Sequence, residues 1–493
     1  MLAGMGAGAV GVGAGGLTMR ARAGVDGPKY LIVIGCFGGA SMLDCFLPVD
    51  VNEALTHEQR GTVISYPTVQ PSGSNIRCVD RNRPRQFLEA HAADSVVLST
   101  LSSSVNHNVA QARSINGRDV FAGRTLMEAV ASVHGAGLPL PNVNMGRGGY
   151  AQPGTDARLD PRFRAEVVTN PVTFALATSG HKGLLPVGSE PAFDPAVRAA
   201  MIERTRALRD GTLEEMSPFG QTFANSRLRR KLLGNRAGVE RRTEELDLVQ
   251  KLLFVDDFGG FLPLDDFGLS GSAEVDRVLD AFPGARPTST SGIADERLDA
   301  QAALAYLLLR TGSSSAVTLT EPGTDGFLAF DQSHGNHRQA QRTHWDRVLR
   351  VASRLIGLLQ TAEYEDANGP TGTSMWDRSM IVFATEFGRD KWDLGGGFGT
   401  GHHLNNGLLV CSPLLRGNRS LGVPDPNNGF ACGFDPIDGT PTPFDDVPAG
   451  EDPLFSDPRQ PPSEEAVFGT LLHALDIEYD GQEVIGTMLK RTI

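Results

Sequence analysis

The chain has 493 residues, of which 40% are hydrophobic and 21% are charged, so it is long enough and apolar enough to bury a large core. Its 45 Lys and Arg residues against 58 Asp and Glu residues give a formal net charge of −13, which argues against a general binder of nucleic acid or of anionic membranes. Five cysteines without a C-x-x-C spacing indicate neither a disulfide scaffold nor a cysteine zinc cluster.

Residues 1–23 are a run of small, mildly apolar residues that ends in Ala21-Arg22-Ala23. This ending fits the A-x-A pattern of signal-peptide cleavage, although the basic start of a signal is missing. We therefore expect a signal-like leader, with a twin-arginine segment upstream of Met1, and a protein exported to the periplasm or cell surface. A glycine-rich leader without a targeting role is the alternative. We expect no integral membrane segment, because no segment offers about 20 apolar residues.

Short apolar runs alternate with helical stretches along the rest of the chain. The run at 29–35 ends in glycine, which is typical of a strand buried on both faces of a parallel sheet. Similar runs follow at 95–101, 315–320, 379–385 and 407–411, and helical stretches lie at 122–134, 196–209, 241–254, 296–310 and 338–360. In the last helix, apolar residues from Trp345 to Leu359 recur with the spacing of one buried face. The alternation predicts an α/β sandwich with a mostly parallel central sheet.

We expect residues 24–493 to form one domain that carries two additions. The stretch from about 151 to 292 is largely helical and predicts an insertion on the sheet domain, and its basic run at 227–231 predicts a solvated helix face. Residues 424–462 hold ten of the thirty prolines and lack the D-x-D-x-D-G order of a calcium loop. They predict a long surface loop.

Histidines and carboxylates gather near the ends of the later predicted strands, where α/β proteins place their sites. Five of the eleven histidines lie between residues 334 and 403. Carboxylates and neutral imidazoles from separate loops suit zinc, manganese or a dinuclear site. The expected ligands of one or two such ions are Asp331, His334, Glu386, and one of the neighbours His402 and His403, with Asp44 for a second ion. For any one histidine alone, a surface or hydrogen-bonded role is the alternative, and we expect His344 to be structural.

Two serine clusters compete for the role of nucleophile. Ser41 follows the glycine pair after the first strand, whereas Ser103 and Ser104 lie in a serine run that precedes His107. A hydroxyl beside a histidine suits a nucleophile with a base or a metal ligand. For the serines alone, a capped loop between strand and helix is the preferred interpretation. The chain has no H-E-x-x-H, G-x-S-x-G or Walker motif that would choose between them.

These motifs together resemble the secreted bacterial family called domain of unknown function 1501, of the alkaline phosphatase and sulfatase-like superfamily. The elements that carry the resemblance are G-G-x-S-x-x-D at 38–44, the serine loop and histidine at 102–107, F-D and H at 330–334, W-D at 376–377, E-F-G-R at 386–389, the paired histidines at 402–403 and a final helix at 466–475. The resemblance implies an alkaline-phosphatase-like three-layer sandwich with a helical insertion, a metal site of the superfamily type and export.

Three positions depart from the family pattern. Two residues, Gln332 and Ser333, separate Asp331 from the next histidine where one is usual, and Thr385 replaces a serine. Gly401 replaces an aspartate before the paired histidines, which removes a possible ligand and favours one metal ion or none.

We therefore expect a metal-dependent hydrolase of phosphate or sulfate esters in the cell envelope, acting on a small-molecule or polysaccharide ester. Arg389 would neutralise the ester oxygens. The alternative is a catalytically silent exported protein that keeps the fold and serves as a polysaccharide-binding or assembly factor. Gly401 and the lack of a clear nucleophile favour this alternative. The sequence does not predict the oligomeric state.

Overall fold

The predicted apolar runs form the centre of an eight-stranded sheet. The computed structural model describes residues 20–21, 27–177, 194–226, 229, 233, 251–254, 273–286, 294, 296–321, 329–366, 368–393, 399–444, 452–455 and 460–490. The sheet has the order β18 (Arg419–Leu421), β7 (Ser95–Leu101), β17 (Asn405–Cys411), β13 (Ser379–Thr385), β2 (Tyr30–Cys36), β10 (Ala316–Thr320), β8 (Asn142–Asn144) and β9 (Glu166–Val167). The five predicted strands correspond to β2, β7, β10, β13 and β17.

The sheet is parallel except at β17, which runs antiparallel to both of its neighbours, β13 and β7. The pairs β13–β2, β2–β10, β10–β8, β8–β9 and β7–β18 are all parallel. The prediction of an α/β protein with a mostly parallel sheet is confirmed. Because β17 is reversed, its beginning lies at the edge where the other strands end.

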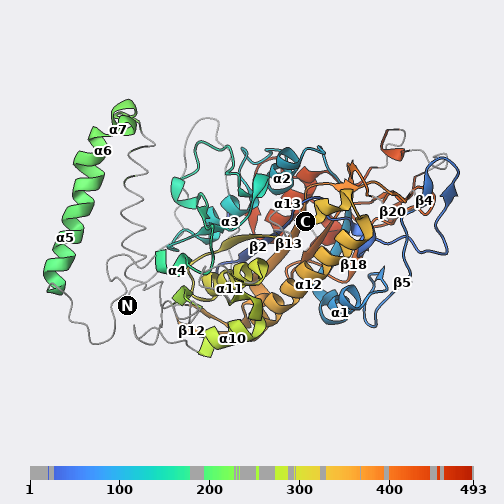
Figure 1. The fold of residues 1–493 in the computed structure, drawn as a ribbon, viewed down its shortest axis with the longest axis horizontal. Helices are drawn as coiled ribbons and strands as arrows, with labels where there is room; N and C mark the ends of the chain where they lie inside the picture. The colour runs from blue at the N-terminus through green and yellow to red at the C-terminus, as the bar shows by residue number, and fades with distance from the viewer. Residues whose placement is uncertain are drawn as a thin grey trace.

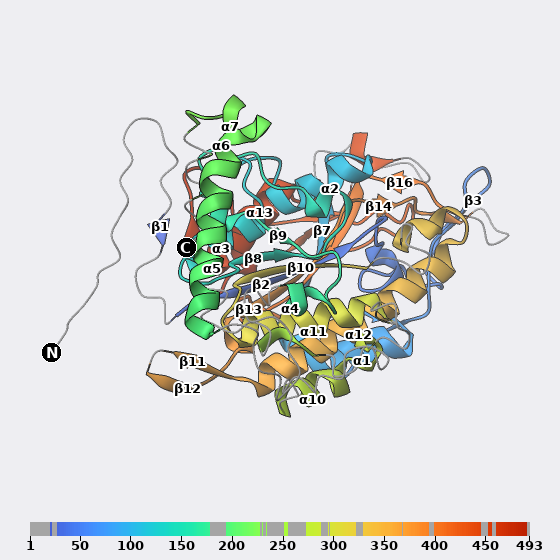
Figure 2. The same cartoon turned by 60° about the vertical axis from the view of Figure 1, so that its left-hand side comes forward.

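Helices cover both faces of the sheet (Figures 1 and 2). Ile32 and Ile34 of β2 pack in one core with α1 (Asn82–His91), α10 (Ala273–Ala281), α11 (Arg297–Arg310) and α12 (His337–Thr361). Leu31 and Val33 face the other core with α2 (His107–Asn116), α3 (Leu126–His134) and α13 (Glu464–Ala474). Successive side chains of a strand point to opposite faces, so a strand buried on both sides must be apolar throughout, as β2 is.

Short elements surround this framework. Small sheets are formed by β1 (Arg20–Ala21) with β21 (Ile477–Glu478), β3 (Thr56–His57) with β4 (Gly61–Val63) and β15 (Trp392–Asp393), β5 (Thr68–Val69) with β6 (Cys78–Val79), β11 (Glu363–Asp366) with β12 (Gly369–Ser374), β14 (Gly388–Arg389) with β16 (His402–His403), and β19 (Gly433–Phe434) with β20 (Pro441–Thr442). None of the described helices is long and apolar enough to cross a membrane.

The stretch expected as a helical insertion contains α4 (Phe174–Ala177), α5 (Pro195–Leu208), α6 (Glu214–Met216) and α7 (Pro218–Thr222). Figure 1 shows α5 to α7 at a distance from the sheet, whereas β9 and α10 from the same stretch belong to the sheet and its helical layer. Most of the leader, of the predicted helix at 241–254 and of the basic run at 227–231 lies outside the described residues.

Candidate metal centre

The candidate metal centre lies at the edge of the sheet where the parallel strands end. Glu386 follows β13, and His107 begins α2 after β7. Asp331 and His334 belong to a 3-10 helix, Ala329–His334, between β10 and α12. His402 reaches the same edge because it precedes β17, the reversed strand. The topology therefore gathers side chains that are far apart in the sequence.

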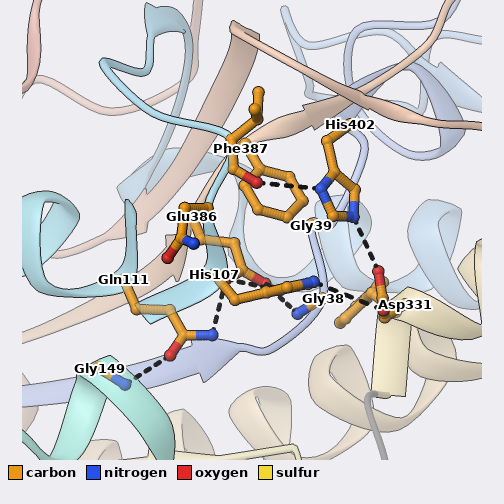
Figure 3. Close-up of polar contacts among 12 residues, drawn as sticks. Gly38, Gly39, His107, Gln111, Gly149, Asp331, Glu386, Phe387 and His402 are labelled. Carbon is orange, nitrogen blue, oxygen red and sulfur yellow. Dashed lines mark hydrogen bonds and ion pairs between the residues drawn. The ribbon is translucent and has the colours of Figure 1, made fainter. Parts of the chain in front are cut away.

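Three of these side chains converge closely enough to hold a metal ion (Figure 3). His402 Nε2 lies 3.1 Å from Asp331 Oδ1, and His107 Nε2 lies 3.6 Å from Asp331 Oδ2. The ligand atoms of a tetrahedral zinc ion, each about 2 Å from the metal, are about 3.3 Å apart. The two observed distances, each to a different oxygen of Asp331, are close to that value, and one ligand atom from each of the three residues lies within 4.8 Å of the others. Nitrogen and carboxylate oxygen are ligands that zinc and manganese accept.

The hydrogen bonds of the two histidines determine which ring nitrogen carries the proton. The other nitrogen of each ring then directs its lone pair at Asp331. His402 Nδ1 lies 3.0 Å from the carbonyl oxygen of Val105, and His107 Nδ1 lies 3.2 Å from both carboxylate oxygens of Glu386. These oxygens only accept, so each Nδ1 carries the proton and donates it. Both Nε2 atoms of the neutral rings then direct lone pairs at Asp331, an arrangement that needs a cation or an additional proton between them.

Glu386 holds His107 in this orientation. Its fully buried carboxylate accepts hydrogen bonds from the Gly38 N–H group, from Gln111 Nε2 at 2.6 Å and from His107. Gln111 is fixed in turn, because its side-chain oxygen accepts from the Gly149 N–H group at 2.6 Å (Figure 3). Glu386, predicted as a ligand, lies behind His107 as the carboxylate of a carboxylate–histidine pair, a common arrangement around protein-bound metals.

The lack of a side chain at Gly38 allows its backbone to lie directly against the Asp331 segment. Its φ angle is +97°, and a Cβ atom there would lie 2.1 Å from the Asp331 backbone nitrogen. No other residue type fits this position without moving the Asp331 segment.

Arg389 holds Asp331 from the other side. Its guanidinium group is fully buried and donates to Asp331 Oδ1 at 2.6 Å, to the Gly38 carbonyl and to the Thr400 carbonyl at 3.1 Å. Burial would raise the pKa of Asp331, but its contact with His402 and the hydrogen bond and charge of Arg389 outweigh burial and lower this pKa to about 2. Asp331 is therefore ionised near neutral pH, and the geometry favours a role for Arg389 in orienting Asp331 over contact with an ester.

His334 adds a fourth side chain at the exposed side of the group. Its Nε2 atom lies 2.8 Å from His402 Nε2 and 3.2 Å from Asp331 Oδ1, and 47% of its side chain is exposed. Burial and the charge of Arg389 lower the pKa of His334. For His107, burial lowers the pKa, but the hydrogen bond and charge of Glu386 outweigh burial and raise it.

The remaining predicted site residues have partners outside the candidate metal centre. Asp44 pairs with His337 at 2.9 Å and accepts from Tyr66 and Ser41. Ser103 donates to Glu464 at 2.5 Å, Ser104 Oγ accepts from the Asn106 N–H group, and His403 lies 3.0 Å from Asp452. Within the described part of the chain, none of the side chains of Asp44, Ser41, Ser103, Ser104 and His403 forms a hydrogen bond or ion pair with the side chains of His107, Asp331 and His402.

His107 is the residue that was absent from the predicted ligand set. The sequence places it after a buried strand, in a serine loop where a base or a metal ligand was considered, and this position is the signal that points to it. What the sequence lacks is the strand order, which puts β7 and β13 on either side of β17 and so brings their ends to His402.

Comparison of the chain with models of protein families found no match, and comparison with curated protein sequences found none either.

Proposed function

We propose that this chain is a metal-dependent hydrolase of phosphate or sulfate esters, with zinc or manganese as its cofactor and an ester of a small molecule or a polysaccharide as its substrate. The observation that carries the proposal is that His107 Nε2 and His402 Nε2 both point at the Asp331 carboxylate while their Nδ1 atoms are held by acceptors. Neutral imidazoles held in this way are typical metal ligands.

In this proposal His107, Asp331 and His402 hold the ion and His334 faces the open side of the site. When bound, the metal supplies a nucleophilic water near neutral pH and a positive charge for the ester oxygens. Glu386 keeps the His107 Nε2 lone pair directed inward, and Arg389 keeps Asp331 ionised. The side chains of Glu386 and Arg389 are both fully buried.

We also propose the alkaline-phosphatase-like fold, the relation to the family called domain of unknown function 1501, and export to the periplasm or cell surface. The mostly parallel sheet between two helical layers is compatible with that fold. The family-like motifs around Gly38, His107, Asp331, Glu386 and His402 lie at one edge of this sheet, which supports the relation.

A catalytically silent exported protein that binds polysaccharide or assists assembly is the second candidate. It is favoured by the serine hydroxyls, since Ser41 is bound to Asp44, Ser103 to Glu464 and Ser104 to a backbone N–H group. In this case the metal is structural and no ester is turned over.

The test starts with metal content by mass spectrometry, after the purified protein has been reconstituted with zinc or manganese. We expect one or two equivalents in the wild type, loss in the His107→Ala/His402→Ala double variant, and retention in His403→Ala. His403 is the matched control, because it neighbours His402 but pairs with Asp452. A wild type without bound metal overturns the proposal.

A panel of phosphate and sulfate esters then separates the two candidates. Turnover that disappears with a chelator and in the double variant supports the hydrolase. Bound metal without turnover of any ester, with each divalent metal, supports the silent protein.

A further inference from the structure

Thr400 has all of its polar groups bound, although it lies in a loop. Its N–H group donates to the Ser333 carbonyl at 2.9 Å, and its own carbonyl accepts from Arg389 Nη1 at 3.1 Å. Its hydroxyl lies 2.7 Å from His337 Nδ1. Thr400 lies two residues before His402, so the contacts that hold Thr400 also restrain the backbone that leads to His402.

His337 is itself held in one orientation. Its Nε2 atom lies 2.9 Å from Asp44 Oδ2, and both residues are buried. Because a carboxylate accepts, Nε2 carries the proton, and Nδ1 is left to accept the hydrogen bond of the Thr400 hydroxyl. His337 begins α12, directly after the 3-10 helix that carries Asp331.

The three partners of Thr400 all belong to the structure that holds Asp331. Ser333 is two residues beyond Asp331, His337 starts the helix that follows, and Arg389 donates to Asp331 Oδ1. The contacts of Thr400 thus link the loop that leads to His402 with the Asp331 segment, in addition to the pairing of β16 with β14.

The series Thr400, His337 and Asp44 also has the order of a nucleophile, its base and an orienting carboxylate. Burial decides against that role, because Thr400 is only 3% exposed and its hydroxyl faces the buried His337. A nucleophile must contact substrate, whereas a docking residue works best when water is excluded from its hydrogen bonds.

We propose that Thr400 is a positioning residue that docks the loop of His402 onto the Asp331 segment and thereby sets the metal affinity of the site. The inference rests on the proposed metal-dependent function. It adds a role for His337 and Asp44, which are the central and the last member of the same hydrogen-bonded series.

Two substitutions distinguish the effect of the Thr400 hydroxyl from the effect of side-chain size. Thr400→Val keeps the shape and removes the hydrogen bond to His337, whereas Thr400→Ser keeps the hydroxyl. We expect Co²⁺ titrations followed by visible absorption to show about tenfold or greater weakening and an altered spectrum in Thr400→Val, with wild-type behaviour in Thr400→Ser. His337→Gln, which cuts the same series at its centre, should change affinity in the same direction as Thr400→Val.

Hydrogen exchange of residues 399–405 in metal-free protein tests the docking without any metal. We expect faster exchange in Thr400→Val than in wild type or Thr400→Ser, while exchange in α12 is unchanged. Equal exchange in the three proteins, or equal Co²⁺ affinity and spectra, overturns the inference. A wild type that binds no Co²⁺ overturns the proposed function, and the exchange measurement then still decides whether Thr400 docks the loop.

Discussion

The side chains of the candidate metal centre differ sharply in their exposure. Glu386 and Arg389 are fully buried, whereas nearly half of the His334 side chain reaches solvent. Charged groups are buried only when hydrogen bonds and partner charges compensate the loss of water. Glu386 meets this requirement through Gln111, His107 and the Gly38 N–H group. Arg389 meets it through Asp331. The buried groups therefore set the geometry, and the exposed histidine lies at the solvent side of the group.

Replacing Glu386 by Gln should weaken metal binding while the protein remains folded. The substitution keeps the size of the side chain but removes the negative charge that orients His107 and makes its Nε2 a better ligand. We expect the metal affinity to fall by about 10- to 100-fold, measured by competition with a chromophoric chelator. Glu321→Gln is the matched control, because Glu321 is also buried and paired with a histidine, His344, outside the metal group. Equal affinities in the two variants contradict an orienting role.

Replacing Arg389 by Met should destabilise the metal-free protein strongly. The variant leaves the nearly buried Asp331 carboxylate without its ion-pair partner, and such a loss costs about 3–5 kcal/mol of the free energy of unfolding. Urea unfolding with a chelator present measures the change. Arg85→Met removes an exposed pair with Asp80 and should cost less than about 1 kcal/mol. Adding Asp331→Asn to Arg389→Met should restore part of the loss, and a purely additive double variant would contradict the pairing.

The helix α12 could be predicted in detail because its pattern depends on local spacing. The apolar residues from Trp345 to Leu359 that define its predicted face are all buried in the structure. The strands β8 and β9 could not be predicted, because they have three and two residues, and Asn142 and Asn144 interrupt the apolar pattern. They join the sheet through pairing with β10 and with each other, which no local pattern reveals.

Gly357 in the C-terminal part of α12 offers a stabilising substitution. A Cβ atom there meets nothing within 4 Å, so Gly357→Ala should gain about 0.5–1 kcal/mol of the free energy of unfolding by reducing the conformational freedom of the unfolded chain. The control is Gly469→Ala in α13, where the Cβ atom would lie 2.0 Å from the Glu483 carbonyl oxygen, and this variant should be destabilised. Chemical unfolding of both variants measures the difference. Destabilisation by both substitutions would show that α12 has no room for a Cβ atom at position 357.

Across the whole molecule, local patterns identified the candidate centre only in part. Asp331, His334 and His402 could be grouped because each lies in a loop next to a predicted strand. The orienting roles of Glu386 and Arg389 could not be predicted, because they depend on burial and on which atoms meet. The inclusion of His107 depends on the reversed strand β17 between β7 and β13, a feature of chain topology that motif spacing does not contain.

The stability of the molecule should depend on pH through histidines far from the candidate centre. Burial lowers the pKa of His91 and of His134 below the ordinary value of 6.5. At pH values between the lowered pKa and 6.5 the unfolded chain binds protons that the folded chain does not, so each residue contributes stability above pH 6.5 that is lost as the pH falls. His107, whose pKa is raised, has the opposite effect, and its contribution is lost as the pH rises.

Substituting His91 isolates one of these contributions. We expect His91→Gln to reduce the decline of the free energy of unfolding below pH 6.5, measured by urea unfolding at a series of pH values with a chelator that keeps metal out of the histidine cluster. Ser353→Ala removes the hydroxyl that lies 2.8 Å from His91 Nε2 but leaves the imidazole in place, so its stability curve should be shifted without a change of slope. A slope in His91→Gln equal to that of the wild type would mean that His91 takes up its proton as readily in the folded chain as in the unfolded one.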